Sequence, residues 1–96
     1  KIFFCNSGSE ANDSAIKIVW YYHASLGNPQ KRKIISRKGS YHGVTLAAAS
    51  LTALEYAQKG FSLPLDFAIH TSWPHYFQNS NQNESEKYLL GQYHNA

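Results

Sequence analysis

The sequence predicts an α/β fold in which βαβ units build a mainly parallel sheet. The short apolar run at residues 2–5 has the length and composition of a buried strand, and residues 33–37, with the apolar pair Ile34-Ile35, are predicted as a second strand. Between them lies a segment with helical periodicity, long enough for the crossover that parallel strands require. The 96 residues are 43% hydrophobic and 15% aromatic, so we expect one small domain or part of one.

The first strand, residues 2–5, is expected to end in a turn over residues 6–9, where a helix begins. Ser7 and Glu10 have the spacing of a capping box, in which the two side chains satisfy backbone donors at the helix start. Glu10 and Asp13 also place negative charge near the positive end of the helix dipole. These signals predict a helix that starts at the turn.

A set of apolar residues then recurs at helical spacing and predicts which face of this helix is buried. The set is Ala11, Ala15, Ile18, Val19 and Tyr22. The helix is expected to run to about His23 and to end before residues 27–29, because Gly-Asn-Pro is a strong helix breaker.

The rest of the chain continues the alternation of strands and helices. A second strand is expected at residues 33–37, a turn at 39–43, a helix from 44 to about 57 and, after Pro64, a third strand at 67–70. Beyond these elements the sequence predicts an aromatic loop at 73–77, an exposed polar segment at 78–83 and a further helix over 84–90.

Composition argues against several classes of function. Nine Lys and Arg against six Asp and Glu give a net charge of +3, too small for the cationic surface of a nucleic-acid binder. No apolar stretch approaches the ~20 residues of a membrane span, and the histidines show no metal-ligand spacing. The single cysteine, Cys5, excludes an internal disulfide and favours a cytoplasmic location. We therefore expect no nucleic acid, membrane or metal as a partner.

The turn at residues 6–9 is the first candidate site, because a predicted strand there meets the N-terminus of a helix. The first N–H groups of a helix have no internal partners, and the helix dipole adds positive potential. Gly8 lets an anion approach the backbone, and Ser7 and Ser9 add hydroxyl donors. The alternative is that Ser7 only caps the helix and Gly8 only turns the chain.

The turn at residues 39–43 follows the second strand, so Tyr41 and His42 are expected at the same sheet edge as the first turn. The two turns would then face one site. A flat aromatic ring there can stack on a planar ligand. The alternative is a turn whose aromatic side chain packs into the core.

Taken as a set, these motifs resemble the class III aminotransferases, and the omega-amino acid:pyruvate type is the most similar. The resemblance extends over residues 1–77. It rests on two motifs in the order and separation of the family, FFCNSGSEAN at residues 3–12 and SYHG at residues 40–43. Residues 15–17, 33–37, 44–46 and 50–52 support it.

The resemblance implies that residues 1–96 are part of the large domain of a fold-type-I enzyme, which binds pyridoxal 5'-phosphate at the ends of its parallel strands. Gly8 and Ser9 match the positions that hold the cofactor phosphate. Tyr41 matches the aromatic that stacks on the cofactor ring, and His42 is its neighbour in the motif. The implied reaction transfers an amino group between an amine or amino acid and a keto acid, in a homodimer.

No residue of the chain matches the family's catalytic lysine or the acid that pairs with the pyridine nitrogen, so the sequence assigns no catalytic residue. The chain begins at Lys1 and contains no methionine, and we therefore expect a segment of a longer protein. Two alternatives stay open: a non-catalytic phosphate-binding α/β module, and a truncated product without activity.

Overall fold

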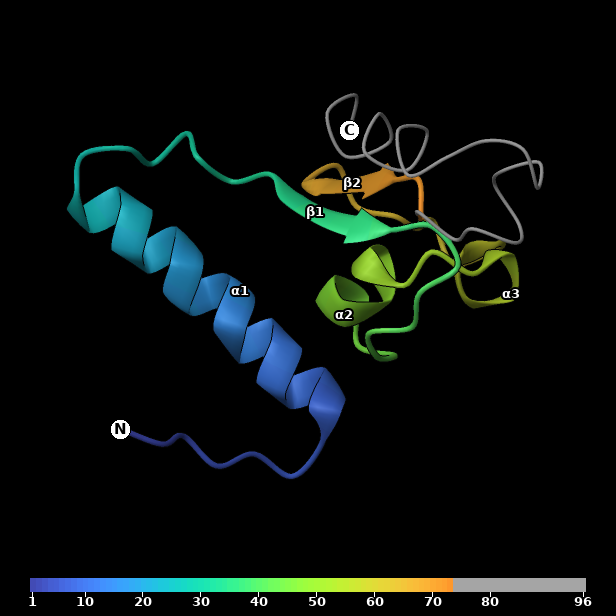
Figure 1. Ribbon diagram of the computed structural model, residues 1–96, viewed down its shortest axis with the longest axis horizontal. Coiled ribbons are helices and arrows are strands. Elements are labelled where there is room, and N and C mark those ends of the chain that lie inside the picture. Colours follow the sequence, from blue (N-terminus) through green and yellow to red (C-terminus); the bar gives the residue numbers. More distant parts are fainter. Residues whose placement is uncertain (74–96) are drawn as a thin grey trace, which may run out of the picture.

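The computed structural model describes residues 1–73, which form two parallel strands and three helices (Figure 1). In chain order these are helix α1 (Gly8–Ser25), strand β1 (Ile34–Arg37), helix α2 (Leu46–Leu51), helix α3 (Glu55–Gln58) and strand β2 (Ala68–Thr71). The parallel strands place Ile34 opposite Ala68 and Arg37 opposite Thr71. The predicted α/β class with a parallel sheet is confirmed. Of the predicted loop at 73–77 only Trp73 is described, and the predicted segments at 78–83 and 84–90 lie outside the described residues.

Helix α1 begins where the capping box indicates. Ser7 has an extended backbone, and its Oγ accepts a hydrogen bond from the Glu10 N–H at 3.1 Å. The Glu10 carboxylate accepts in turn from the Asn6 N–H at 3.0 Å. Both bonds satisfy donors that the helix cannot pair itself. The helix ends at Ser25, ahead of the predicted breaker at residues 27–29.

The predicted strand at residues 2–5 is wrong, because this segment has no regular secondary structure. Ile2 and Phe4 are 81% and 87% exposed. A strand needs a neighbour whose backbone groups pair with its own, and the sheet within residues 1–73 consists of β1 and β2 alone. The βαβ unit that the structure contains is therefore not the first predicted one but the following one, from β1 to β2, with α2 and α3 in its crossover.

The predicted buried face of α1 is also wrong. The predicted set, Ala11, Ala15, Ile18, Val19 and Tyr22, is exposed. The covered side instead carries Ile16, which is buried, and Trp20, which packs against the same core. The predicted stripe has a helical period, but period alone does not say which side of a helix its neighbours contact. Within residues 1–73 the neighbours of α1 contact the side of Ile16 and Trp20.

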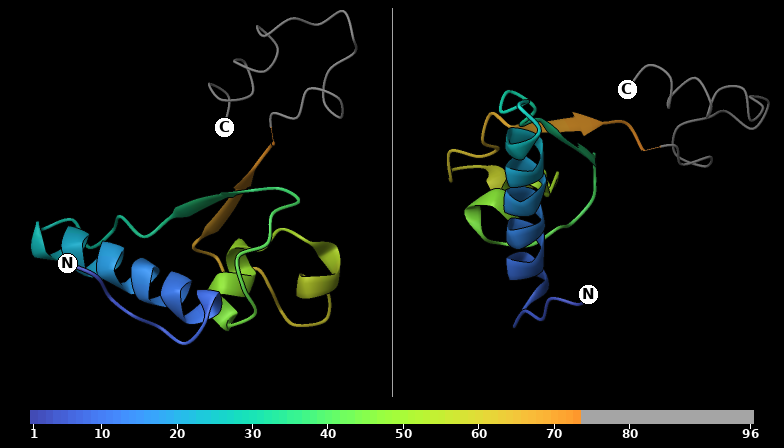
Figure 2. Two further views of the ribbon diagram at one scale, coloured as in Figure 1. Left: turned by 60° about the horizontal axis from the view of Figure 1, so that its bottom comes forward. Right: turned by 90° about the vertical axis from the view of Figure 1, so that its left-hand side faces the viewer.

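The core joins α1 to α2 and to the residue before β2. Its buried members are Ile16, Leu51 and Phe67, with Trp20, Ile34, Ala47 and Ala68 packed against them. The Trp20 and Phe67 rings meet edge to face at 5.2 Å, an arrangement that ring quadrupoles favour. The Trp20 indole N–H donates to the Arg32 carbonyl at 2.9 Å, and the Arg32 guanidinium lies 4.5 Å from the ring centre. These contacts fasten α1 beside the sheet, with its N-terminal end close to α2 (Figure 2).

The predicted helix over residues 44–57 is two shorter helices, because the chain leaves the helix after Leu51. Ala53 pairs with the loop that follows β1: its N–H donates to the Ser40 carbonyl and its carbonyl accepts from the Gly39 N–H, both at 2.9 Å. The Gln58 side chain then donates to carbonyls at the end of α2. Long-range pairing of this kind overrides local helix propensity.

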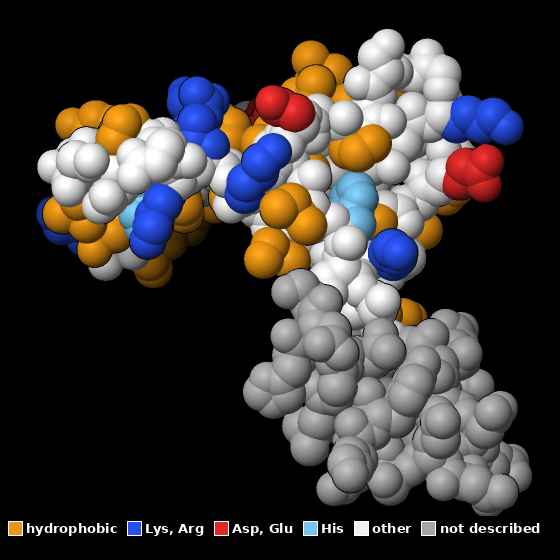
Figure 3. Space-filling view, turned by 90° about the horizontal axis from the view of Figure 1, so that it is seen from above, with side chains coloured by type: hydrophobic (Ala, Val, Ile, Leu, Met, Phe, Trp, Pro, Cys, Tyr) orange, Lys and Arg blue, Asp and Glu red, His pale blue; other side chains and the backbone are white. Residues whose placement is uncertain are grey.

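Large apolar side chains are exposed on several elements (Figure 3). They include Phe3 and Phe4 ahead of α1, Ile18 and Tyr21 on α1, and Val44, Leu46, Tyr56 and Phe61 around α2 and α3. Exposed apolar surface on this scale is typical of a face that another protein surface covers. In the part of the chain that is described, no helix has the length and apolar character that crossing a membrane requires.

Candidate cofactor site

The turn before α1 and the turn after β1 meet at one pocket of about 370 Å³. Its lining is Ser7, Gly8, Ser9, Asn12, Tyr41, His42 and Gly43. All four predicted site residues, Gly8, Ser9, Tyr41 and His42, are therefore brought together, as expected for two turns that face one site. Asn12, which belongs to the first motif but was not predicted as a site residue, also lines the pocket.

The α1 side of the pocket presents backbone donors. Ser7 already accepts from the Glu10 N–H through its hydroxyl and from the Ala11 N–H through its carbonyl. The N–H groups of Gly8 and Ser9, in contrast, donate to no acceptor within residues 1–73. A Cβ placed on Gly8 would meet nothing within 4 Å, so there is room for a ligand beside the backbone. Free donors at the positive end of an 18-residue helix suit an anion.

Ser9 contacts both sides of the pocket. Its Oγ accepts a hydrogen bond from the Val44 N–H at 3.0 Å, which ties the second turn to α1. A hydroxyl that accepts one bond retains its hydrogen to donate. Ser9 can therefore hold the turn and donate to an anion at the same time.

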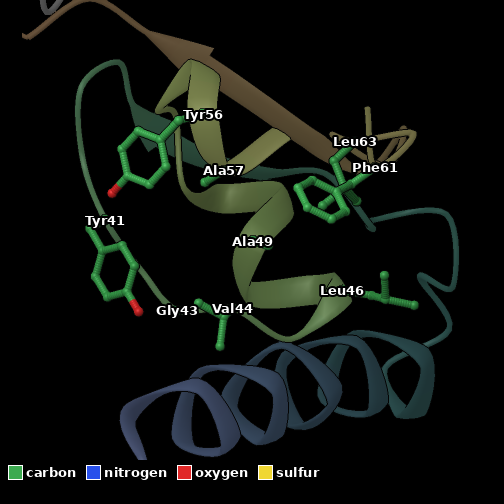
Figure 4. Close-up of a pocket in the computed structure, with 9 residues that line it drawn as sticks. All are labelled: Tyr41, Gly43, Val44, Leu46, Ala49, Tyr56, Ala57, Phe61 and Leu63. Atoms are coloured by element: carbon green, nitrogen blue, oxygen red, sulfur yellow. The ribbon is translucent and has the colours of Figure 1, made fainter. Parts of the chain in front are cut away.

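Tyr41 is 59% exposed and does not pack into the core. The alternative, a turn whose aromatic side chain is part of the core, is therefore wrong. It lines the pocket beside Gly8 and Ser9, and it also lines a second, apolar pocket of about 330 Å³ (Figure 4). The apolar pocket is lined by Tyr41, Gly43, Val44, Leu46, Ala49, Tyr56, Ala57, Phe61 and Leu63. Tyr41 therefore stands between an anion-compatible pocket and an apolar one.

His42 is held by hydrogen bonds on its ring and on its backbone. Its Nε2 lies 2.9 Å from the Ser40 hydroxyl, which itself donates to the Arg37 carbonyl. Because Ser40 has a single hydroxyl hydrogen, the hydrogen between Ser40 and His42 belongs to Nε2. Within residues 1–73 no group of three or more His, Cys, Asp or Glu is placed to hold a metal ion.

Sequence reasoning missed the residues that hold the second turn in place. The Asn12 Nδ2 donates to the His42 carbonyl at 2.6 Å. On the opposite side the Thr52 hydroxyl accepts from the His42 N–H at 2.7 Å and donates to the Gly43 carbonyl at 3.1 Å. Asn12 stands on the same helix face as Ser9, three residues on, and that spacing was the available signal.

A family model described as aminotransferase class-III matches residues 1–95. Among curated proteins, a probable gamma-aminobutyrate transaminase 3, mitochondrial, of Oryza sativa subsp. indica is 53% identical over 87 residues, which are 91% of this chain and 17% of that protein. A mitochondrial gamma aminobutyrate transaminase 1 of Solanum lycopersicum is 51% identical, with the same 91% and 17% coverage.

Solved structures give the same result. The omega transaminase from Pseudomonas jessenii in complex with PMP superposes with a TM-score of 0.89 and 49% identity, over 96% of this chain and 20% of that one. A structure described as a transaminase with L-ala has a TM-score of 0.85 and 48% identity, over 92% and 21%. The chain thus spans 17% of the first relative's length and 20% of the Pseudomonas enzyme's.

The match confirms the resemblance inferred from the two motifs. The similarity to solved transaminases confirms the fold of a fold-type-I transferase for the part of it that this chain covers. The family model covers residues 1–95, and this disfavours the alternative of a non-catalytic phosphate-binding module. The chain belongs to the class-III aminotransferase family.

Proposed function

We propose that the whole protein is an aminotransferase that uses pyridoxal 5'-phosphate to move an amino group between an amine or amino acid and a keto acid. Residues 1–96 would form part of its cofactor-binding large domain. The observation that carries the proposal is the pocket that is lined both by the N-terminus of α1 and by Tyr41. Family membership supports it.

The residues of the pocket fit the cofactor. Its phosphate requires donors and positive potential, and the N–H groups of Gly8 and Ser9, the Ser9 hydroxyl and the dipole of α1 supply both. Its ring requires a flat apolar surface, which Tyr41 supplies. His42 would keep the turn in shape through Ser40 and Thr52.

When bound, the cofactor supplies an electron sink for the bond that is broken. The roles of this chain's residues are binding and orientation: Gly8 and Ser9 anchor one end of the cofactor, and Tyr41 sets the plane of its ring. No residue of the chain is proposed as catalytic, because the motifs identify none.

For the amino donor we propose a compound whose amino group is remote from its carboxylate, such as gamma-aminobutyrate. The rice and tomato relatives are named gamma-aminobutyrate transaminases, and the Pseudomonas relative an omega transaminase. The test is to purify the full-length protein with the cofactor and to measure amino transfer from gamma-aminobutyrate and from L-alanine to a keto acid. Faster transfer from gamma-aminobutyrate is expected.

The non-catalytic alternatives predict a different result in the same assay. A phosphate-binding module would bind inorganic phosphate saturably and transfer no amino group. A truncated product would have an mRNA with a stop codon just after the codon for Ala96. Family membership over nearly the whole chain disfavours the first, and transcript sequencing tests the second.

We infer that a second copy of the protein covers the apolar pocket beside Tyr41, making a homodimer. The support is that the pocket is lined by apolar side chains that are exposed here, among them Val44, Leu46 and Phe61. Light scattering of the full-length protein is expected to give the mass of a dimer, and Val44→Lys is expected to shift it toward the monomer. A monomeric wild-type protein would overturn this.

For the compartment we propose the cytoplasm, because the single Cys5 is a free thiol. The rice and tomato relatives are named mitochondrial, so a mitochondrial location is the competing outcome. A fluorescent fusion to the complete gene product, imaged against a mitochondrial dye, decides between them. We propose neither nucleic acid nor membrane lipid as a partner.

A further inference from the structure

Asp13 caps a helix to which it does not belong. Its Oδ1 accepts hydrogen bonds from the Thr45 hydroxyl at 2.7 Å and from the Ala48 backbone N–H at 3.0 Å. Thr45 is the N-cap residue of α2, yet its side chain makes no capping bond to that helix. Ala48 is the third residue of α2, a position whose N–H an N-cap side chain commonly satisfies. A carboxylate from α1 therefore provides the cap that α2 lacks.

Asp13 is one of three side chains on α1 that hold the segment after Tyr41. Ser9, one helical turn before Asp13, accepts from the Val44 N–H, and Asn12, the residue directly before Asp13, donates to the His42 carbonyl. Helix α1 thus both presents free N–H groups to the pocket and holds the turn at residues 39–43 through hydrogen bonds. The separation between the anion-compatible end and this turn is set by α1.

The position of the Tyr41 ring is not fixed by hydrogen bonds or ring contacts of its own side chain within residues 1–73. Within residues 1–73 its side chain makes no hydrogen bond and no ring contact, and it is largely exposed. Its place is determined through the backbone of its neighbour His42, which is held by Asn12 from one side and by Thr52 from the other. Whatever anchors the segment after His42 therefore also places the ring.

We propose that Asp13 is a positioning residue for the cofactor ring, which acts by capping α2 and so holding Tyr41 at a constant distance from the N-terminus of α1. This rests on the proposed function, because it presumes that Tyr41 stacks on the cofactor. Asp13 is not among the lining residues of the pocket. It therefore acts through Tyr41 and not by contact with the cofactor.

The test separates ring binding from phosphate binding in the full-length protein. For each variant we would measure the Kd of pyridoxal 5'-phosphate by fluorescence, the Kd of inorganic phosphate for the cofactor-free protein, and the visible circular dichroism of the bound cofactor. Asp13→Ala removes the cap, and Asp13→Asn keeps an acceptor oxygen in its place. Asp66→Asn is the matched control, because Asp66 is an exposed aspartate whose side chain makes no hydrogen bond within residues 1–73.

Asp13→Ala is expected to raise the cofactor Kd about tenfold and to weaken its circular dichroism, while the phosphate Kd changes less than about twofold. Asp13→Asn is expected to recover most of the loss, and Asp66→Asn to change neither constant. In a Tyr41→Ala background, Asp13→Ala is expected to change the cofactor Kd less than about twofold, because the ring that it positions is gone.

Three results would overturn the proposal: an unchanged cofactor Kd in Asp13→Ala, an equal loss of phosphate affinity, or an undiminished effect in the Tyr41→Ala background. If Asp13→Ala does not fold, Thr45→Val removes one of the two bonds to Asp13 and is expected to give about a threefold rise in the cofactor Kd. A wild-type protein that binds no pyridoxal 5'-phosphate would instead overturn the proposed function itself.

Discussion

Ser9 and Gly43 lie so close together that no side chain fits between them. A Cβ on Gly43 would stand 2.5 Å from the Ser9 Oγ and 2.8 Å from the Ala48 Cβ. Gly43 also has φ of +130°, a backbone conformation that residues with a side chain rarely adopt. The contact allows the Val44 N–H to reach Ser9, so the approach of two backbones creates the pocket.

Gly43→Ala is expected to destabilise the full-length protein by about 2–4 kcal/mol, because overpacking adds to backbone strain. The measurement is the free energy of unfolding in urea. Gly60→Ala is the control, since Gly60 has φ of +82° but a Cβ there would meet nothing within 4 Å. Its cost is expected to be about 1–2 kcal/mol from strain alone. Equal losses for the two variants would contradict the steric argument.

Ser9→Ala is expected to weaken retention of the cofactor roughly 10- to 100-fold, the range for one hydrogen bond to a charged group. The Kd of pyridoxal 5'-phosphate, measured by fluorescence after dialysis, reports it. Ser25→Ala is the matched control on α1, because Ser25 donates only to the Tyr22 carbonyl in the last turn. Retention equal to that of the wild type would remove Ser9 from the phosphate site.

Tyr41→Ala is expected to lower turnover roughly 3- to 10-fold through loss of stacking. It is also expected to change the free energy of unfolding by less than about 0.5 kcal/mol, because the ring is 59% exposed and its hydroxyl makes no hydrogen bond within residues 1–73. Tyr41→Phe keeps the ring and is expected to behave as the wild type. Steady-state kinetics and thermal unfolding of the same samples separate the two effects, and a large fall in stability would show that the ring is structural.

Thr52→Val is expected to cost about 1–3 kcal/mol of stability, since it leaves the His42 N–H without an acceptor at a fully buried site. Thr71→Val is the control in β2: its hydroxyl makes no hydrogen bond within residues 1–73, and valine suits a strand. Urea unfolding measures both variants. A neutral Thr52→Val would mean that water replaces the hydroxyl.

Residues 1–96 produced alone are expected to associate and to unfold without a sharp transition. A two-stranded sheet is marginal by itself, and Ile2, Phe4 and Ile18 are exposed apolar residues that need a cover. Light scattering and calorimetry check this. A cooperative transition in a monomeric sample would contradict it.

Elements with a local chemical signature were predictable from the sequence. Ser7 and Glu10 located the start of α1 because a capping box depends only on neighbours in the chain. The runs that became β1 and β2 were also recognised, within a residue at each end. Residues 2–5 failed because a strand exists only where a partner supplies its hydrogen bonds, and composition does not show the partner.

The same distinction applies to the site. The motifs brought Gly8, Ser9, Tyr41 and His42 to one pocket, although their roles toward a cofactor stay predictions. The roles of Asn12, Asp13 and Thr52 in holding the second turn were missed, because each bonds to groups far along the chain. Local patterning carries no information on such pairs, and an aspartate in the first turns of a helix already has an adequate explanation in the helix dipole.

The placement of Ser9 and Asp13 on one helix bears on which insertions the family can tolerate. An extra residue between them would rotate Asp13 about 100° away from Ser9 and release the second turn. An extra residue in the connection from α1 to β1, residues 26–33, would leave both contacts intact, because neither depends on it. Length variation among homologous chains is therefore expected in that connection and not in the first two turns of α1.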